Sequence, residues 1–339
     1  MPNERLRTIV TTDGECDDMN SFVRLLFYAN EMDLRGIVLT SSCYHHIGKR
    51  WAGETWPHEY IDAYAEIWPS LLEHDPAYPS PEHLHSIVAV GNIRDVSDTS
   101  EATPGSELIR REILSDNHEP LYLQCWGGAN TVARALMDID CTETERSRLS
   151  RKLVLYLIGT QDDCYEDYIR KNWPEITTIH NLHGFEALSF KWERLLAPDQ
   201  QRTLFSFWQK KYILHKNVLM EKYHSHHDGH EYPGEEDALQ FGRRRMPWKM
   251  FLYKLMTHGD FFRRGDFLSE GDSPAFLFLI GDGKRGLASL DSGNWGGKYT
   301  RQTEFYYSDS DDAIQWMGEQ ITEINEDFAR RIVWAEHTD

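Results

Sequence analysis

The chain has 339 residues, and its 55 acidic residues outnumber its 36 basic residues to give a formal net charge of −19. This charge excludes the phosphate attraction that dominates nucleic-acid binding, so we expect no nucleic-acid partner. No apolar run is long enough to span a membrane, and the N-terminal residues are charged where a signal peptide is apolar. We therefore expect a cytoplasmic protein without a membrane partner, although a leader removed beforehand would leave the same sequence.

The first predicted elements are a strand, an acidic loop and a helix. Residues 7–12 form an apolar run typical of a buried strand, and residues 18–31 carry apolar side chains at helical spacing. Another apolar run at 36–40 completes a βαβ unit, whose strands we expect to be parallel.

The same pattern returns further along the chain. Residues 121–136 and 153–172 each read as a strand, a turn and a helix, and shorter apolar runs predict a strand at 176–179 and a buried helix at 276–280. This alternation predicts an α/β fold of the Rossmann type, with an open, mostly parallel sheet flanked by helices.

Two regions depart from the alternation. Residues 42–119 contain too many tryptophans, prolines and helical stretches for a connection, so we interpret them as an insertion over the site. Residues 195–262 are predicted to be mainly helical, and we expect residues 1–339 to form a single domain with these helical insertions. Five cysteines without CxxC spacing are expected to be reduced.

The stretch TTDGECDD places Asp13, Glu15, Asp17 and Asp18 within six residues at the end of the first strand. Carboxylates so close together repel one another unless a proton or a cation neutralises them. Hard oxygen donors favour Ca²⁺ or Mg²⁺, and Asp272, just before a long apolar element, is the best candidate for a further ligand. Alternatively, Asp17 and Asp18 only cap the helix that follows.

Other polar residues are predicted at the same edge of the sheet, since ligands of such sheets bind beyond the carboxyl ends of the strands. The turn Trp126–Asn130 and the residues Gln161 and Asp162 follow predicted strands there. Gln161 and Asp162 are candidates to line the pocket, or they form a plain turn and helix cap.

These motifs resemble those of the nucleoside hydrolases. TTDGECDD resembles the family's N-terminal aspartate signature, WGGANTVARAL its second motif, and GDSPAFLFLI its C-terminal motif. The resemblance is closer still to the nucleoside hydrolase-like family that is labelled cellulose-binding, through DDMNSFVRLLFYANEMDLRGIV, WGGAN, IGTQDD, EGDSPAFLFLI and NWGGKY in that order.

The resemblance implies one bound Ca²⁺ that holds the nucleophilic water and two ribose hydroxyls. Asp13 would be a ligand and the general base, Asp18 and Asp272 would be further ligands, and the carbonyl of Ala129 would be another. Asp17 would accept a hydrogen bond from a ribose hydroxyl. These residue types suit cleavage through an oxocarbenium-like sugar, which needs nearby negative charge, a positioned water and a base.

Three positions depart from the family's pattern. Thr11 stands in place of an Asp, Glu15 in place of a Gly, and Gly271 in place of a His that would help the leaving group depart. Without that acid a nucleobase leaves more slowly. The substrate is therefore left open between a ribonucleoside and an O-glycoside or other furanosyl compound.

Further candidates could contact a small sugar or nucleoside. Trp126 and Trp295 are flanked by glycines and could stack on a sugar or a base, or they pack in the core. Asn130 is also a candidate for substrate binding. His45 and His46 could supply the missing acid, or they have ordinary polar roles.

The leading hypothesis is a Ca²⁺-dependent hydrolase of N-glycosidic or related furanosyl bonds. The alternative is a non-catalytic carbohydrate-binding module on the same scaffold, and phosphoryl transfer is disfavoured because its further motifs are missing. The His-rich loop HSHHDGHE offers imidazoles for zinc, or is simply polar. Whether the chain forms a homo-oligomer is left open.

Overall fold

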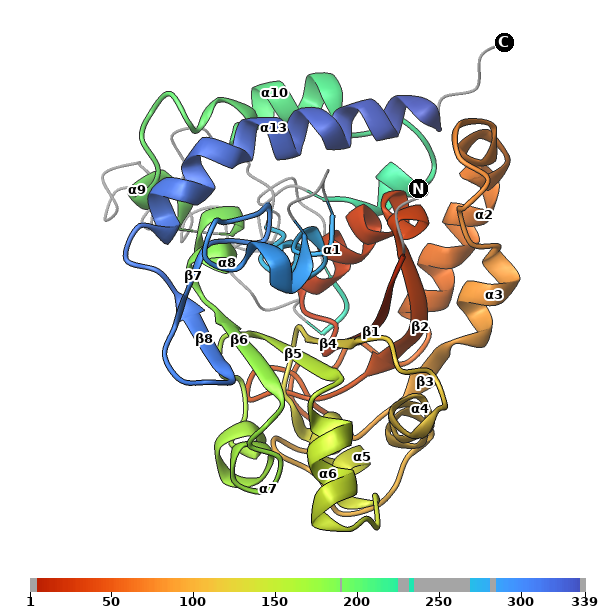
Figure 1. The fold of residues 1–339 in the computed structure, drawn as a ribbon. Helices are drawn as coiled ribbons and strands as arrows, with labels where there is room; N and C mark the ends of the chain where they lie inside the picture. The colour runs from red at the N-terminus through yellow and green to blue at the C-terminus, as the bar shows by residue number, and fades with distance from the viewer. Residues whose placement is uncertain (1–4, 190, 225–231, 235–268, 281–284, 336–339) are drawn as a thin grey trace.

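The computed structural model describes residues 5–189, 191–224, 232–234, 269–280 and 285–335, which are built around one sheet of eight strands (Figure 1). The strands are β1 (Leu6–Thr12), β2 (Met32–Leu39), β3 (Val88–Val90), β4 (Leu121–Cys125), β5 (Leu153–Ile158), β6 (Thr177–Asn181), β7 (Tyr299–Arg301) and β8 (Tyr306–Asp309). Their order is β3-β2-β1-β4-β5-β6-β8-β7, and every pair is parallel except β7 with β8. The predicted fold class is confirmed.

Helices cover both faces of this sheet (Figure 1). They are α1 (Cys16–Phe27), α2 (Trp56–His74), α3 (Pro81–Ser86), α4 (Pro104–Leu114), α5 (Asn130–Met137), α6 (Glu143–Ser150), α7 (Arg170–Asn172), α8 (His183–Leu188), α9 (Trp192–Leu195), α10 (Ser206–Tyr212), α12 (Ser273–Leu277) and α13 (Ala313–Trp334). Helix α13 lies with α1 and α8 on one side, and α5 lies with α4 on the other.

The strands alternate their side chains between two hydrophobic clusters. Val10 and Tyr122 join the cluster that contains α1, α12 and α13, whereas Ile9 and Leu123 join the cluster under α4 and α5. Successive residues of a strand point to opposite faces. A sheet covered on both faces therefore needs continuous apolar strands, and this explains why the short apolar runs predicted it.

Helix α1 begins two residues earlier than the predicted helix at 18–31, and it ends earlier. The N–H of Met19 donates to the carbonyl of Glu15 at 3.0 Å, so the first turn starts at Cys16. After Phe27 the chain tightens into a 3₁₀ turn, Ala29–Glu31, and enters β2. The strand begins at Met32, ahead of the predicted 36, because it pairs with β1 from Leu6 onward.

The segment 42–119 contributes to the main sheet as well as adding helices. It contains α2 and α3, and then the edge strand β3, which pairs with the end of β2, and the helix α4. Strand β3 has only three residues, all half-buried, and its short apolar run at 87–90 was not among the predicted strands, because it lies within the segment interpreted as an insertion.

The predicted helical segment at 195–262 is described only in part. Its described residues contain the 3₁₀ turns Arg202–Leu204 and Leu219–Lys222 and the helix α10, while residues 225–231 and 235–268 lie outside the described residues. Within the described ranges no helix combines the length and apolar character that a bilayer crossing requires.

Candidate active site and cation site

The acidic loop connects β1 to α1 at the carboxyl edge of the sheet. Between Thr12 and the helix start, Gly14 has a φ of +78°, the left-handed region that favours glycine. A Cβ on Gly14 would lie 3.0 Å from Nε1 of Trp56, the first residue of α2. Helix α2, which belongs to the segment predicted as an insertion, therefore packs directly against this loop.

Asp17 and Asp18 lie in the first turn of α1, but neither is its N-cap. The N-cap residue is Glu15, whose side chain makes no capping hydrogen bond. Asp18 Oδ1 instead accepts hydrogen bonds from the Thr12 hydroxyl and, at 3.2 Å, from the N–H of Asp13. Helix capping does not account for this pair, although their charges still favour the helix dipole.

Asp272 completes the cluster from the other end of the chain. It immediately precedes α12, and one oxygen from each of Asp17, Asp18 and Asp272 lies within 4.8 Å of the other two. All three side chains are buried, with exposed fractions of 6%, 2% and 1% in that order. The fold thus gathers acids from both ends of the sequence.

Two buried contacts hold the Asp272 segment against α1. Asn20 donates from Nδ2 to the carbonyl of Ser269 at 2.9 Å. Arg24 forms an ion pair with Glu270, with Nη2 and Oε1 2.7 Å apart. Because Asn20 and Arg24 belong to the same helix as Asp17 and Asp18, these contacts fix the spacing of the cluster.

Burial and mutual repulsion dominate the electrostatics of the cluster. Burial raises the pKa of Asp18 well above its usual value, and the charges of Asp13, Asp272 and Asp17 raise it further. The pKa of Asp272 is likewise raised well above its usual value, first by burial and then by Asp17 and Asp13. Without a compensating positive charge, such carboxyls take up protons.

The donor set fits a hard cation. Oδ2 of Asp13 and Oδ2 of Asp272 are buried, and neither has a hydrogen-bond partner among the residues that the structure describes. Leaving buried carboxylate oxygens unsatisfied is costly unless a ligand completes them. Since every donor is a carboxylate oxygen, the site suits Ca²⁺ or Mg²⁺ better than zinc.

The turn after β4 lies directly against the acidic loop. A Cβ on Gly127 would lie 2.9 Å from Cβ of Asp13, and a Cβ on Gly128 would lie 2.5 Å from Oδ2 of Asp162. Glycines are therefore required for this close approach. Ala129 follows as the N-cap residue of α5, and its carbonyl accepts a hydrogen bond of that helix at 2.8 Å. Its role as a cation ligand stays a prediction.

Trp126 and Asn130 are fully buried on either side of these glycines. The Trp126 ring packs near Phe276, with ring centroids 6.3 Å apart, as the core-packing alternative expects. Asn130 donates from Nδ2 to the Ser41 hydroxyl at 2.9 Å and to the Asn92 carbonyl at 2.8 Å. Both side chains join neighbouring segments, and substrate contact by either stays a prediction.

Gln161 and Asp162 follow β5 at the same edge. Gln161 donates from Nε2 to the backbone carbonyl of Trp126, and the backbone carbonyl of Gln161 accepts from the N–H of Cys43 at 2.8 Å. Asp162 accepts from the N–H of Cys164 at 3.0 Å, and burial raises its pKa. These contacts match a structural turn, while contact with a ligand stays a prediction for both.

The two histidines after β2 differ in position. Burial lowers the pKa of His45, and the charge of Asp13 acts against that shift, so His45 lies near the acidic loop. His46 is turned elsewhere, because its Nε2 lies 3.9 Å from Oδ1 of Asp95. Contact of either histidine with a ligand stays a prediction.

Phe185 is a site residue that the sequence did not reveal. A Cβ on Gly271 would lie 2.2 Å from Cδ2 of Phe185 and 3.0 Å from Oδ2 of Asp17. The half-buried Phe185 ring therefore occupies the space that a side chain at 271 would need. The glycine in place of a histidine was the only sequence signal, and it did not identify the residue that fills the gap.

Trp295 lies in a loop that packs on the start of α8. The carbonyl of Gly296 accepts from Nδ2 of Asn181 at 3.0 Å, and a Cβ on Gly184 would lie 2.8 Å from that carbonyl. Trp295 itself is half-buried against the core. The loop therefore adjoins the helix that carries Phe185. Stacking of Trp295 on a ligand stays a prediction.

The zinc alternative concerned the loop HSHHDGHE, which includes His226, His227 and His230. Those three residues lie outside the described residues. Among the described residues, the groupings of three or more side chains able to hold a metal are both in the acidic region, one of them being Asp17, Asp18 and Asp272.

Comparison with known proteins identifies the family and agrees with the fold. Residues 7–299 match the family described as cellulose-binding Sde182, nucleoside hydrolase-like domain. A solved nucleoside hydrolase-related hypothetical protein from Saccharophagus degradans, associated with carbohydrate metabolism, shares 23% identity at a TM-score of 0.73, over 99% of this chain and 73% of that one. No curated protein matches the chain.

A more distant likeness is to the inosine-uridine preferring nucleoside hydrolase from Bacillus anthracis. It shares 11% identity at a TM-score of 0.45, over 96% of this chain and 99% of that one.

Proposed function

The chain belongs to the family of cellulose-binding Sde182, nucleoside hydrolase-like domains, and from this premise we propose that it is a Ca²⁺-dependent hydrolase of N-glycosidic or related furanosyl bonds. The observation that carries the proposal is the convergence of Asp17, Asp18 and Asp272 within 4.8 Å, beside Asp13. A stability role alone would not require buried acids that repel one another.

In this proposal Asp13, Asp18 and Asp272 hold the cation, together with the carbonyl of Ala129. When bound, Ca²⁺ would offset the repulsion among these carboxylates, hold ligand hydroxyls and lower the pKa of a nearby water. Asp17, which lies beside Asp272 and Gly271, is left to accept a hydrogen bond from a sugar hydroxyl.

Asp13 acts as the general base. It takes a proton from the attacking water while the oxygen of that water bonds to the anomeric carbon and the bond to the leaving group breaks. The sugar becomes oxocarbenium-like as this bond breaks, and the surrounding carboxylates stabilise its positive charge. Trp56, whose indole Nε1 approaches the loop at Gly14, helps to exclude bulk water.

The leaving-group side distinguishes this site. Residue 271 is a glycine, so it has no side chain that could donate a proton to the leaving group. Phe185 fills the space beside it. A general acid typically contributes about 10²- to 10⁴-fold in rate. We therefore favour substrates whose leaving group departs readily as an anion, and a proton supplied by His45 or His46 stays a prediction.

Two measurements test the proposal. Titration calorimetry of chelator-treated protein should show Ca²⁺ binding that Asp18→Asn weakens severely, whereas the exposed control Asp291→Asn should bind as the wild type does. A panel of nucleosides and 4-nitrophenyl furanosides should give sugar release that Asp13→Ala abolishes. Absence of Ca²⁺ binding would refute the cation site, and full turnover by Asp13→Ala would refute its role as base.

The competing function is a carbohydrate-binding module without catalysis. The missing acid at Gly271 and the family's description as cellulose-binding favour it. In that case Ca²⁺ should bind and sugars should raise the thermal unfolding temperature, with no sugar released from any substrate at long incubation times.

A further inference from the structure

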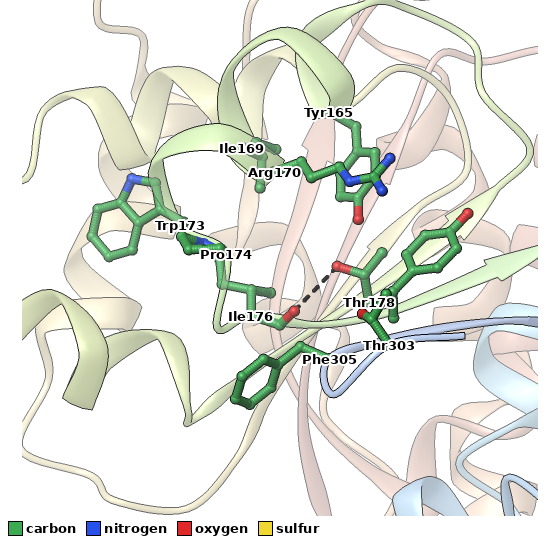
Figure 2. Close-up of a pocket in the computed structure, with 10 residues that line it drawn as sticks. Tyr165, Ile169, Arg170, Trp173, Pro174, Ile176, Thr178, Thr303 and Phe305 are labelled. Carbon is green, nitrogen blue, oxygen red and sulfur yellow. Dashed lines mark hydrogen bonds between the residues drawn. The ribbon is translucent and has the colours of Figure 1, made fainter. Parts of the chain in front are cut away.

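The pocket in Figure 2 has its main polar groups paired with protein atoms. It has a volume of about 180 Å³ and lies between η2 (Tyr165–Ile169) and the starts of β6 and β8. The Thr178 hydroxyl donates to the Ile176 carbonyl at 3.3 Å, and Arg170 forms an ion pair with Glu166 at 2.9 Å. Donors that are accessible to a ligand outside the acidic cluster lie elsewhere, on α2 and α3.

Two histidine rings meet between α2 and α3. Nδ1 of His58, on α2, lies 2.8 Å from Nδ1 of His85, on α3. The ring centroids are 5.1 Å apart, and the ring planes are inclined by only 13°. This centroid separation is about the largest that a 2.8 Å contact between ring nitrogens allows. The two nitrogens therefore point directly at each other, and the rings lie edge to edge in nearly one plane.

Asp62 determines which nitrogen of His85 is free. Its Oδ1 lies 3.1 Å from Nε2 of His85, and a carboxylate can only accept a hydrogen bond. Nε2 of His85 therefore carries the hydrogen, and Nδ1 of the neutral ring presents a lone pair to His58. Asp62 follows His58 by one turn of α2, so both side chains project from the same side of that helix toward α3.

The helices are anchored in the core, while the rings remain accessible to solvent. Ile61 on α2 and Leu84 on α3 are fully buried. The ring of His58 is half-buried, and the side chain of His85 is 32% exposed. The packing of the two helices thus holds the ring nitrogens close together, and a solvated ion can still reach them.

From this geometry we propose that His58 and His85 bind a divalent transition-metal ion through their Nδ1 atoms, with Asp62 orienting His85. Imidazole nitrogens suit Zn²⁺ and Cu²⁺, whereas the carboxylates of the acidic cluster suit Ca²⁺. A carboxylate that accepts the second ring hydrogen is the usual support of a metal-binding histidine. Zinc–nitrogen bonds of about 2.0–2.1 Å at a tetrahedral angle place two nitrogens roughly 3.3 Å apart, so the rings separate by about 0.5 Å.

The metal replaces the hydrogen that the two rings share. In the metal-free pair, Nδ1–H of His58 donates to the lone pair of His85. When the ion binds, this proton passes to solvent and Nε2 of His58 takes one up, so both rings stay neutral. Structural zinc sites have four protein ligands. A pair of histidines leaves the other positions to water, so the site is open, and it stands whether or not the acidic cluster is catalytic.

The test is titration calorimetry of the full chain with Zn²⁺, in buffer that contains Ca²⁺ to occupy the acidic cluster. His226→Asn with His227→Asn removes imidazoles of the His-rich loop, and zinc should still bind in this background. Adding His85→Asn should abolish that binding, and adding Asp62→Asn should weaken it roughly 10- to 100-fold. The matched control is Glu66→Gln, because Glu66 is exposed one turn further along α2.

NMR of protein with isotope-labelled histidine identifies the ligand atoms. Zinc should shift the Nδ1 signals of His58 and His85, while the Nε2 atoms of both rings stay protonated. Three results would each overturn the proposal: no zinc binding in the loop background, full affinity after His85→Asn, or coordination through Nε2. Circular dichroism of each variant checks the fold, and the NMR experiment needs no variant that could fail to fold.

Discussion

Arg24 and Glu270 form a buried ion pair, 2.7 Å between Nη2 and Oε1, that ties the helix carrying Asp17 and Asp18 to the segment carrying Asp272. The side chains are only 1% and 3% exposed. The guanidinium also packs over the Phe328 ring at 4.3 Å. The pair lies outside the acidic cluster and yet fixes the distance between its two halves.

Removing one partner of this pair should be strongly destabilising. Arg24→Met leaves Glu270 buried without its counter-charge, and we expect a loss of about 3–5 kcal/mol in the free energy of unfolding. Adding Glu270→Gln should recover part of that loss, because the uncompensated charge is gone. Urea denaturation of the two single variants and the double variant measures the coupling. Additive losses would show that the pair does not act as a unit.

The contact between Gly271 and Phe185 should not tolerate a larger residue. Gly271→Ala places a Cβ 2.2 Å from Cδ2 of Phe185, and such overpacking typically costs about 1–3 kcal/mol. In a Phe185→Ala background the same substitution should cost much less. Denaturation midpoints of the four proteins measure this. An equal cost in both backgrounds would mean that Phe185 does not limit the size of residue 271.

Gly14 should be restricted both by its backbone and by Trp56. Gly14→Ala requires a left-handed φ of +78° and brings a Cβ 3.0 Å from Trp56 Nε1. Gly48 is a matched control, because its φ is +88° and a Cβ there would meet nothing within 4 Å. Gly48→Ala therefore reports backbone strain alone, and we expect Gly14→Ala to be the more destabilising in urea. Equal effects would rule out a crowding contribution from Trp56.

Glu112 should make stability depend on acid pH. Burial disfavours its charge, but hydrogen bonds from Arg35 and Arg7 outweigh burial and lower its pKa in the folded protein. Because the pKa of Glu112 is lower in the folded state, its carboxylate stabilises the protein at pH values above the pKa of the unfolded state, which is about 4.3. This stabilisation is lost as the pH falls through the pKa of the folded state. The stability difference between wild type and Glu112→Gln should therefore be larger at pH 7 than at pH 3.5.

This pH dependence is measured by urea denaturation at both pH values. The control is Glu119→Gln, since Glu119 is exposed and its side chain makes no ion pair among those found in the described residues. A difference between wild type and Glu112→Gln that stays constant with pH would contradict the assignment.

Much of the fold could be predicted because strands and helices leave local patterns. The apolar runs at β1, β4 and β5 are buried on both faces, so each strand was visible without knowledge of its neighbours. Strand β3 was not predicted, because its short apolar run lies within the segment interpreted as an insertion, and only its pairing with β2 assigns it to the sheet.

The acidic loop was found for a similar reason. Four acids within six residues are improbable as a solvated surface beside a buried strand, so the stretch from Asp13 to Asp18 was informative alone. The roles of Trp126 and Asn130 could not be predicted from the sequence, because the partners that bury them, such as Phe276 and Asn92, are distant in the chain.

The sequence by itself determined the alternating sheet and the acidic loop at its carboxyl edge, because periodicity and charge are carried by neighbouring residues. Only the tertiary structure decided that Asp272 joins Asp17 and Asp18, that Phe185 fills the space beside Gly271, and that His46 lies near Asp95. Those facts depend on contacts between side chains far apart in the chain, whose packing no local pattern records.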